Sequence, residues 1–304
     1  MPQNYYDKNY RKELTRVTLL GLLFNILITI LKVTVGYVIR SQALIADGIH
    51  SLSDGITDLA VIFGEPFWTA PADISHPHGH GRIEMLVTIL IGILLGLVGV
   101  FLGFQAIRSI ILFDKKEFIY SIPMTIIAII SVVSKELLYQ YTVFVGKRIH
   151  SSAVIANAWH HRSDSLSSIP VVIAGIGITI NPSYSILDPI GALIVCLLII
   201  YSAYRIILSM LNILVDKGIT KEEMAKIYEI ALSIGGVKSV HAIRSRYIGG
   251  GIAVDLHVMV DPCASVYDGH IIAGRVKHAL LEKGQNVVDV LIHIEPYEKK
   301  EREK

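Results

Sequence analysis

The chain has few of the residues that mark a disulfide-stabilised or nucleic-acid-binding protein. Only two of its 304 residues are cysteines, and Cys196 and Cys263 form neither a CxxC site nor a disulfide framework. Lysine and arginine together number 28 and aspartate and glutamate 26, so the net charge of +2 indicates neither a nucleic acid nor an acidic partner. The sequence therefore argues against a disulfide-stabilised protein and against a nucleic-acid-binding protein.

Charged residues are scarce as well, at 18% of the chain, whereas hydrophobic residues make up 52%. The mean hydropathy of +0.55 is too high for an ordinary soluble domain. Residues 1–16 are polar, and the apolar run that follows them is too long for the core of a signal peptide. We therefore expect an integral membrane protein without a cleavable signal peptide.

Six apolar segments are long enough to cross a bilayer, which takes about 20 residues. They cover residues 17–39, 42–66, 83–112, 119–145, 152–180 and 186–214. Basic residues gather before the first segment and after the fourth, which predicts that both termini are cytoplasmic, as in a bacterial-type inner membrane. Lys115 and Lys116, on the opposite side, weigh against this orientation.

The composition changes abruptly at Asp216. A helix that ends at Gly235 and Gly236 is followed by strands over 237–248 and 251–260, a helix over 266–283 and a strand over 287–294. This order predicts a two-layer α+β domain. We therefore expect a six-helix, all-α transmembrane domain over residues 1–214 and an α+β domain over residues 215–304.

The second and fifth apolar segments carry matching polar residues. His50 and Asp54 are four residues apart, so they lie on one helix face about 6 Å apart along the axis, with Asp47 close to that face. His160 and Asp164 repeat this spacing. A carboxylate near the centre of a membrane helix costs about 2.5–3.5 kcal/mol. Two such pairs predict a four-coordinate N2O2 site, which suits Zn²⁺.

The membrane segments contain five further polar residues: Asn25, Lys32, Lys135, Glu136 and Arg205. Lys32 and Arg205 have side chains long enough to reach the membrane surface, and Lys135 and Glu136 are adjacent, so they cannot share a face. We interpret most of these residues as structural pairs or end anchors. Asn25 is the best placed of them to approach the path of the metal.

Two more groups of histidines have candidate metal-binding spacing. The loop after the second segment contains Asp73, His76, His78 and His80, a short histidine-rich tract that either binds metal or is simply solvated. Histidines also occur at or beside the predicted strands and helix of the second domain, where scattered histidines are usually ordinary surface residues and a metal site is the alternative. These are His241, His257, His270 and His293, with Glu295 on the same side of its strand as His293.

With these motifs assembled, the sequence resembles the cation diffusion facilitators, and among them the bacterial zinc and iron efflux members. The resemblance extends from the first helix to Glu295. It implies that the two four-spaced pairs form the transport site, that the loop after the second helix holds another site, and that a third lies in the cytoplasmic domain. By this match the loop site uses Asp73, His76 and His80, and the cytoplasmic site uses His241, His257, His293 and Glu295, with His270 as a further candidate.

The resemblance also implies a ferredoxin-like, metallochaperone-like C-terminal domain, a homodimer in the lipid bilayer and proton-coupled antiport. It further implies an ion pair between Arg82 and Asp216. Because metal binds deprotonated imidazole and carboxylate, such a site couples opposite fluxes of metal and protons, and imidazole titrates nearest physiological pH. Alternating access by helix rearrangement would then move the site between the two faces of the membrane.

The ligand types favour Zn²⁺ and also suit Cd²⁺, Co²⁺ or Fe²⁺. If Asp47 rather than His50 enters the site, the ligands become harder and the site suits Mn²⁺ or Fe²⁺ better. A metal-gated channel or sensor remains an alternative, as does a purely structural bundle. An intramembrane metalloenzyme does not fit, because the sequence has no HExxH and the two pairs already fill four coordination positions.

Overall fold

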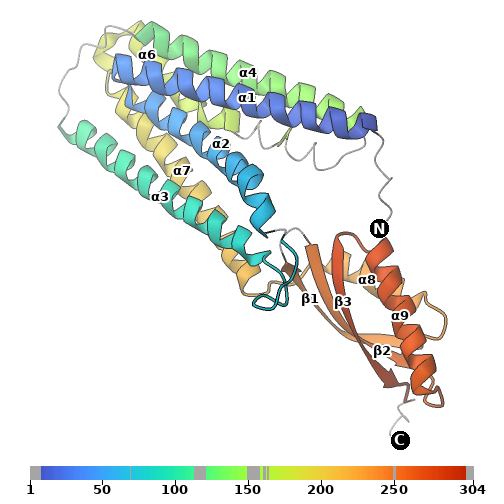
Figure 1. Ribbon diagram of the computed structural model, residues 1–304. Coiled ribbons are helices and arrows are strands. Elements are labelled where there is room, and N and C mark those ends of the chain that lie inside the picture. The colour runs from blue at the N-terminus through green and yellow to red at the C-terminus, as the bar shows by residue number, and fades with distance from the viewer. Residues whose placement is uncertain are drawn as a thin grey trace, which may run out of the picture. The chain divides into compact units, whose positions relative to one another are not determined.

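The computed structural model describes residues 8–68, 70–112, 121–148, 158–159, 162, 164–248 and 251–298, and all of their side chains except those of residues 8–18, 54, 57–62 and 65. Two compact units make up the chain (Figure 1). The first consists of Met1–Phe63 and Leu90–Ile206, and its described regular elements are all helices. The second consists of Gly64–Ile89 and Ile207–Lys304 and contains the sheet.

The second, third, fourth and sixth predicted apolar segments coincide with helices to within three residues, whereas the fifth, 152–180, lies partly outside the described residues and its regular helix begins at Ile169. The helices of the membrane part are α1 (Lys8–Ile39), α2 (Gln42–Trp68), α3 (Arg82–Ile111), α4 (Ser121–Arg148), α6 (Ile169–Ile180) and α7 (Leu187–Leu214), with a 3₁₀ turn, η1 (Pro182–Tyr184), before α7. The first helix begins earlier than predicted, because the polar residues before residue 17 continue it. The prediction of an all-α membrane part is confirmed.

Four of the described helices are long and apolar enough to cross a membrane: Leu19–Ile39, Arg82–Ile111, Ser121–Arg148 and Pro182–Leu214. The second and fifth predicted segments are not among them. α2 contains several carboxylates, and the helical stretch Asp164–Ile180 is short in its described part. These two segments are the ones that carry the predicted ligand pairs.

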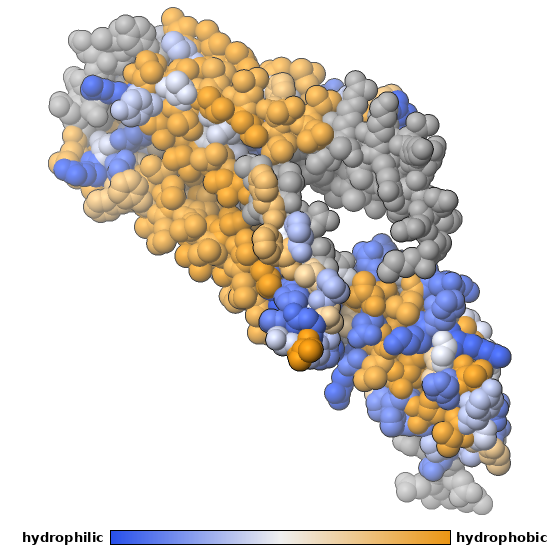
Figure 2. Space-filling model, viewed as in Figure 1, coloured by the Kyte–Doolittle hydropathy of each residue, from blue (hydrophilic) through white to orange (hydrophobic). Residues whose placement is uncertain are grey.

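Small residues bring the helices of the first unit close together. An added Cβ at Gly191 of α7 would lie 3.4 Å from the Cβ atoms of both Ala43 in α2 and Ala174 in α6. Large apolar side chains instead point outward, as on α3, where Leu97 and Phe104 are 62% and 66% exposed. Figure 2 shows hydrophobic residues covering this part of the surface. Small residues inside and large apolar residues outside are expected of helices packed in hydrocarbon.

The helical stretch that contains Asp164 is interrupted just after it. Ser168 forms a turn between the helical residues 164–167 and α6. Pro170 has no amide hydrogen, so the carbonyl of Leu166 loses its normal partner four residues later. The Ser168 amide bonds instead to the Ser165 carbonyl at 3.3 Å, three residues back. The turn with Asp164 therefore joins α6 through a residue that keeps helical backbone angles but lacks the regular hydrogen bond four residues back.

The start of α2 is capped by a carboxylate from α7. Asp188 is 2% exposed, and its Oδ1 accepts hydrogen bonds from Ser41 Oγ at 2.5 Å and from the Ala43 amide at 3.2 Å. Its Oδ2 accepts from the Gln42 amide at 2.8 Å, while Ser41 Oγ accepts from the Leu44 amide at 3.1 Å. Three donors that would otherwise be unpaired in a water-free environment are thus satisfied, and α2 is fixed to α7.

We expect Asp188→Ala to lower the free energy of unfolding by about 2–4 kcal/mol, because it leaves buried donors without an acceptor. Asp188→Asn keeps one acceptor oxygen and should lose less than half as much. Unfolding in mixed micelles of increasing denaturing-detergent content measures both. A control, Ser183→Ala in the exposed turn η1, should change nothing. An unaltered unfolding midpoint for Asp188→Ala would contradict this role.

The second unit contains the small α+β domain. It consists of α8 (Lys221–Leu232), β1 (Ser239–Ile248), β2 (Gly251–Val260), α9 (Val266–Lys283) and β3 (Val287–Pro296). The strand order is β1-β2-β3; β1 and β2 are antiparallel, and β2 and β3 are parallel. Both helices begin with a capping box, at Thr220 and Ser265. The predicted order of elements and the two-layer α+β class are confirmed.

The helices of this domain cover one face of its sheet. Leu256 of β2 lies in a core with Ile227 of α8 and with Val276 and Leu280 of α9. Successive side chains in a strand point to opposite faces, so His257 lies on the face away from this core. That second face is only partly buried, and it carries most of the histidines singled out above.

Candidate metal sites

The predicted transport site lies in the first unit, and the structure describes part of it. His50 in α2 and Asp164 are both buried, at 7% and 6% exposure, and their side chains interact electrostatically. Nδ1 of His50 has no hydrogen-bond partner among the described residues. Asp54 lies in α2, one turn after His50, but its side chain is outside the described residues, and so is the whole of His160.

Asp47, which the sequence offered as an alternative ligand, is bound by other groups. Its Oδ2 lies 2.8 Å from Nζ of Lys32 in α1, and neither side chain is exposed. Ser168 Oγ lies 3.0 Å from Oδ1 and 2.8 Å from Oδ2, and Ser167 Oγ lies 3.3 Å from Oδ1. Both oxygens of Asp47 are therefore engaged, and Lys32 does not extend to the membrane surface.

A second buried lysine belongs to the same polar network. Ser51 Oγ accepts hydrogen bonds from Lys32 Nζ at 3.2 Å and from Lys135 Nζ in α4 at 3.4 Å. Lys32 Nζ also donates to Ser168 Oγ at 3.0 Å. Four helical segments thus meet around two ammonium groups, next to His50. The neighbour of Lys135, Glu136, faces elsewhere and lies 3.5 Å from the Arg162 guanidinium.

This network was not predicted, although its members were visible in the sequence. Lys32 and Lys135 stand inside apolar runs, and a charge there indicates an interior, functional position more often than a surface anchor. The sequence alone did not show which helix faces meet. Asn25, the other polar residue singled out, is buried in α1 at 5% exposure.

The loop before α3 brings Asp73, His76 and His80 together. One ligand atom from each lies within 4.8 Å of the others. Asp73 Oδ1 is 3.4 Å from His76 Nδ1, and Asp73 Oδ2 is 3.5 Å from His80 Nε2. The His76 amide donates to Asp73 Oδ1 at 2.6 Å and, with the nearby imidazoles, lowers the pKa of this carboxyl below its ordinary value. Asp73 therefore stays ionised, as a metal ligand must.

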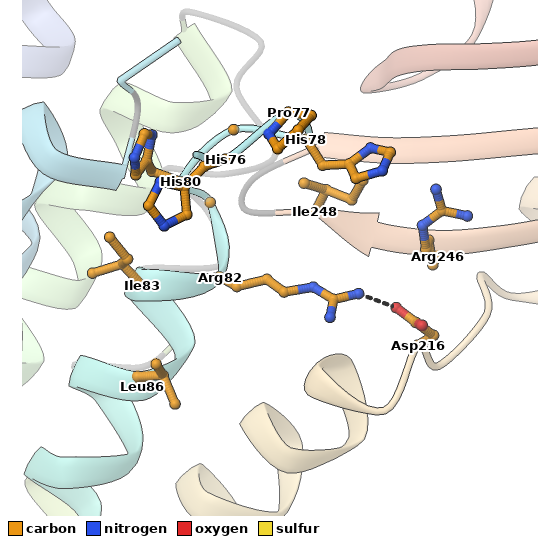
Figure 3. A pocket seen from close by; sticks show the side chains of 12 residues that line it. His76, Pro77, His78, His80, Arg82, Ile83, Leu86, Asp216, Arg246 and Ile248 are labelled. Atoms are coloured by element: carbon orange, nitrogen blue, oxygen red, sulfur yellow. Dashed lines mark hydrogen bonds and ion pairs between the residues drawn. The ribbon is translucent and has the colours of Figure 1, made fainter. Parts of the chain in front are cut away.

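His78 is turned away from this cluster. It lines a pocket of about 570 Å³ in the second unit and points toward Ile248 and Arg246 (Figure 3). In the same pocket Arg82 Nη2 lies 2.8 Å from Asp216 Oδ1, which is the ion pair that the resemblance implied. Both side chains are about half exposed, so this pair contributes little to stability.

The C-terminal domain aligns three histidines across its sheet. His241 pairs with His257 in the antiparallel ladder, and His257 pairs with His293 in the parallel ladder. Glu295 reaches all three: its carboxylate oxygens lie 3.2 Å from His241 Nε2, 2.8 Å from His257 Nδ1 and 3.6 Å from His293 Nε2. The ladder register thus converts four separated residues into one partly exposed cluster of imidazole and carboxylate.

His241, His257 and Glu295 have ligand atoms within 4.8 Å of one another, close enough for one metal ion to contact all three. A bulge follows His241, where Ala242 takes a φ of +49° and locally shifts the register of β1. His270 lies on α9, is exposed, and is not part of the described cluster.

We expect His257→Ala to remove one bound Zn²⁺ per chain from the C-terminal domain, because a ligand and the partner of Glu295 are lost together. The affinity should fall about 100-fold or more. Equilibrium dialysis of the full chain measures the number of bound ions. His270→Ala should leave that number unchanged, and lowering the pH should release the ion because protonated imidazole cannot bind it. Equal loss in both variants would contradict the cluster.

Two family models match this chain. The cation efflux transmembrane domain matches residues 18–215, and the cytoplasmic domain of cation efflux proteins matches residues 219–297. Together they cover the bundle with the buried His50 and the domain with the aligned histidines.

Several known proteins are similar to nearly the whole of this chain. An uncharacterized transporter of Methanocaldococcus jannaschii is 37% identical over 284 residues, which cover 93% of this chain and 99% of that protein. The manganese efflux system protein MneP of Bacillus subtilis is 32% identical over 293 residues, covering 94% and 98%. Metal tolerance protein C1 of Arabidopsis thaliana is 32% identical over 307 residues, covering 96% and 65%.

Among solved structures, a nickel form of the MamM C-terminal domain is 28% identical and covers 26% of this chain and all of that one, with a TM-score of 0.25. The family assignment depends instead on the two family models and the full-length relatives. The transmembrane model alone covers more than half of the sequence. The chain belongs to the cation diffusion facilitator family and is a metal cation efflux transporter, not an enzyme.

Proposed function

We propose that this protein exports Zn²⁺ in exchange for protons, through a tetrahedral site formed by His50, Asp54, His160 and Asp164. In this proposal residues 1–214 carry out transport. Residues 215–304 bind metal at the cluster around Glu295 and hold two chains together as a homodimer. Both termini are cytoplasmic in this arrangement, in agreement with the basic residues near the first and fourth helices.

The observation that carries the proposal is the contrast between His50 and Asp47. The imidazole of His50 is buried, interacts with Asp164 and has a ring nitrogen without a described hydrogen-bond partner. Asp47 uses both of its carboxylate oxygens on Lys32 and on serines. To bind a metal, Asp47 would have to leave an ammonium buried without its counter-ion, which is strongly unfavourable. This contrast supports the imidazole as the ligand from α2.

Two imidazoles and two carboxylates suit Zn²⁺, which accepts tetrahedral nitrogen and oxygen ligands. The same groups bind protons when the metal leaves, so a proton gradient can drive the exchange. The loop cluster of Asp73, His76 and His80 then has a regulatory role. Variants there should alter the rate of transport without abolishing it.

Mn²⁺ is the second candidate ion, because the similar protein MneP is named as a manganese efflux protein. The Mn²⁺ ion favours oxygen ligands over imidazole. A further alternative is a metal-gated channel, in which flux would follow the metal gradient alone, or a sensor, which would show no uptake of any ion. One experiment distinguishes proton-coupled Zn²⁺ export from Mn²⁺ export and from a channel or sensor.

Proteoliposomes that contain the purified full chain would be given an imposed pH gradient and one of Zn²⁺, Mn²⁺, Fe²⁺, Cd²⁺ or Co²⁺. We expect uptake whose rate depends on the pH gradient and is fastest for Zn²⁺, and we expect excess Mn²⁺ to compete poorly. Faster transport of Mn²⁺ than of Zn²⁺ would favour the second candidate. Uptake that is indifferent to the gradient would favour a channel and overturn the antiport.

A further inference from the structure

Lys135 in α4 is a buried cation that the proposed mechanism does not use. It is 1% exposed, and its ammonium makes one hydrogen bond to a described residue, to Ser51 Oγ at 3.4 Å. Among the described side chains, no carboxylate oxygen lies within 4.0 Å of it. Lys32, by contrast, has a carboxylate oxygen at 2.8 Å. The two lysines of the network are therefore in different electrostatic situations.

The charge of Lys135 is not neutralised by the pair beside it. Lys32 and Asp47 together are neutral, and both oxygens of Asp47 are already engaged. A lone ammonium in a membrane bundle is costly, so anionic charge must lie nearby. His50 interacts electrostatically with Asp164 and Lys135 as well as with Asp47 and Lys32. Lys135 also interacts with Asp47, whose charge Lys32 already offsets. The carboxylates near His50 are thus the anions that can balance Lys135.

The position of Ser51 connects the lysine to the ligands. Ser51 follows His50 directly in α2, and its hydroxyl holds the Lys135 ammonium on the inner side of the helix. An ion bound at His50 would share the buried region with this ammonium, without water to screen them. In a low-dielectric interior, two such charges repel each other over several ångströms.

We propose that Lys135 sets the affinity of the transport site: its fixed positive charge balances the site carboxylates when no metal is present and weakens the binding of a divalent ion. This inference rests on the proposed function of the His50–Asp164 site. An exporter needs a site that holds the ion firmly enough to capture it and loosely enough to release it. Lys135 acts as a tethered cation that favours release.

The test compares Lys135→Met, which keeps the length and removes the charge, with Lys135→Arg, which keeps the charge. Zn²⁺ affinity of the full chain in detergent is measured by competition with a fluorescent chelator. All variants are made in a His257→Ala/His80→Ala background, which removes one ligand each from the cluster around Glu295 and from the loop cluster around Asp73. We expect Lys135→Met to bind Zn²⁺ ~10-fold or more tightly and to show a lower maximal transport rate. Lys135→Arg should stay within ~3-fold of the parent affinity.

Leu137→Ala, on the exposed side of the same helix, is the matched control. If Lys135→Met does not fold, Lys135→Gln replaces it, because its amide can still donate to Ser51. Unchanged or weaker Zn²⁺ binding in the folded neutral variant would overturn the proposal. Asp164→Ala in the same background tests the proposed function separately, since undiminished binding there would contradict the site itself, whatever Lys135 does.

Discussion

Replacing Asp164 with alanine is expected to abolish Zn²⁺ flux while leaving the chain folded. The carboxylate is buried beside His50, so its loss removes one of four proposed ligands and one of the proposed proton carriers. Removing even an outer partner of a metal site costs about 10–100-fold, and a ligand should cost at least the upper value. The initial rate of Zn²⁺ uptake into proteoliposomes under a pH gradient measures the effect.

The matched control is Leu166→Ala, two residues away, where the side chain is 59% exposed. It should transport at the rate of the unmodified protein. Size-exclusion chromatography of both variants checks that the chain remains folded and keeps the assembly state of the unmodified protein. Flux retained in folded Asp164→Ala would contradict the four-ligand site, and equal loss in Leu166→Ala would indicate a general defect of the helix.

Breaking the pair of Lys32 and Asp47 is expected to have the largest effect on stability. Both side chains are fully buried, so Lys32→Met leaves an unpaired carboxylate and Asp47→Leu leaves an unpaired ammonium. Each single variant should lose about 3–5 kcal/mol of unfolding free energy. The double variant contains neither charge and should come within about 1–2 kcal/mol of the parent.

Unfolding of the four proteins in mixed micelles of increasing denaturing-detergent content provides this double-mutant cycle. A large coupling energy is the expected result. Strict additivity of the two losses would mean that the pair contributes nothing specific, and then Asp47 would again be open as a metal ligand. The cycle therefore tests both the packing of the bundle and the choice of ligands.

Much of this structure could be predicted because its signals are local. An apolar run long enough to cross a membrane, or a repeat at helical spacing, depends only on neighbouring residues, and α3, α4 and α7 were predicted on that ground. The cluster around Glu295 could be predicted for a similar reason. His241, His257 and His293 fall in the three predicted strands and Glu295 directly follows the last of them, and the strands of a small sheet have few ways to pair.

Contacts between distant segments were not predictable in this way. The hydrogen bonds that Asp188 accepts from the start of α2 join residues 145 to 147 positions apart, and Ser168 donates to Asp47 across 121 positions. No periodicity shows which faces of two apolar helices meet. Lys32 and Lys135 were noted as unusual residues, but their convergence on Ser51 required the packed bundle.

The central claim is that one site of imidazoles and carboxylates exchanges metal for protons. The most direct measurement uses proteoliposomes with equal pH on both sides, a Zn²⁺ gradient and a pH-sensitive dye inside. We predict that Zn²⁺ entry drives protons outward, so that the internal pH rises in step with uptake, and that both movements disappear in Asp164→Ala. Zn²⁺ entry without a change of internal pH would contradict the account.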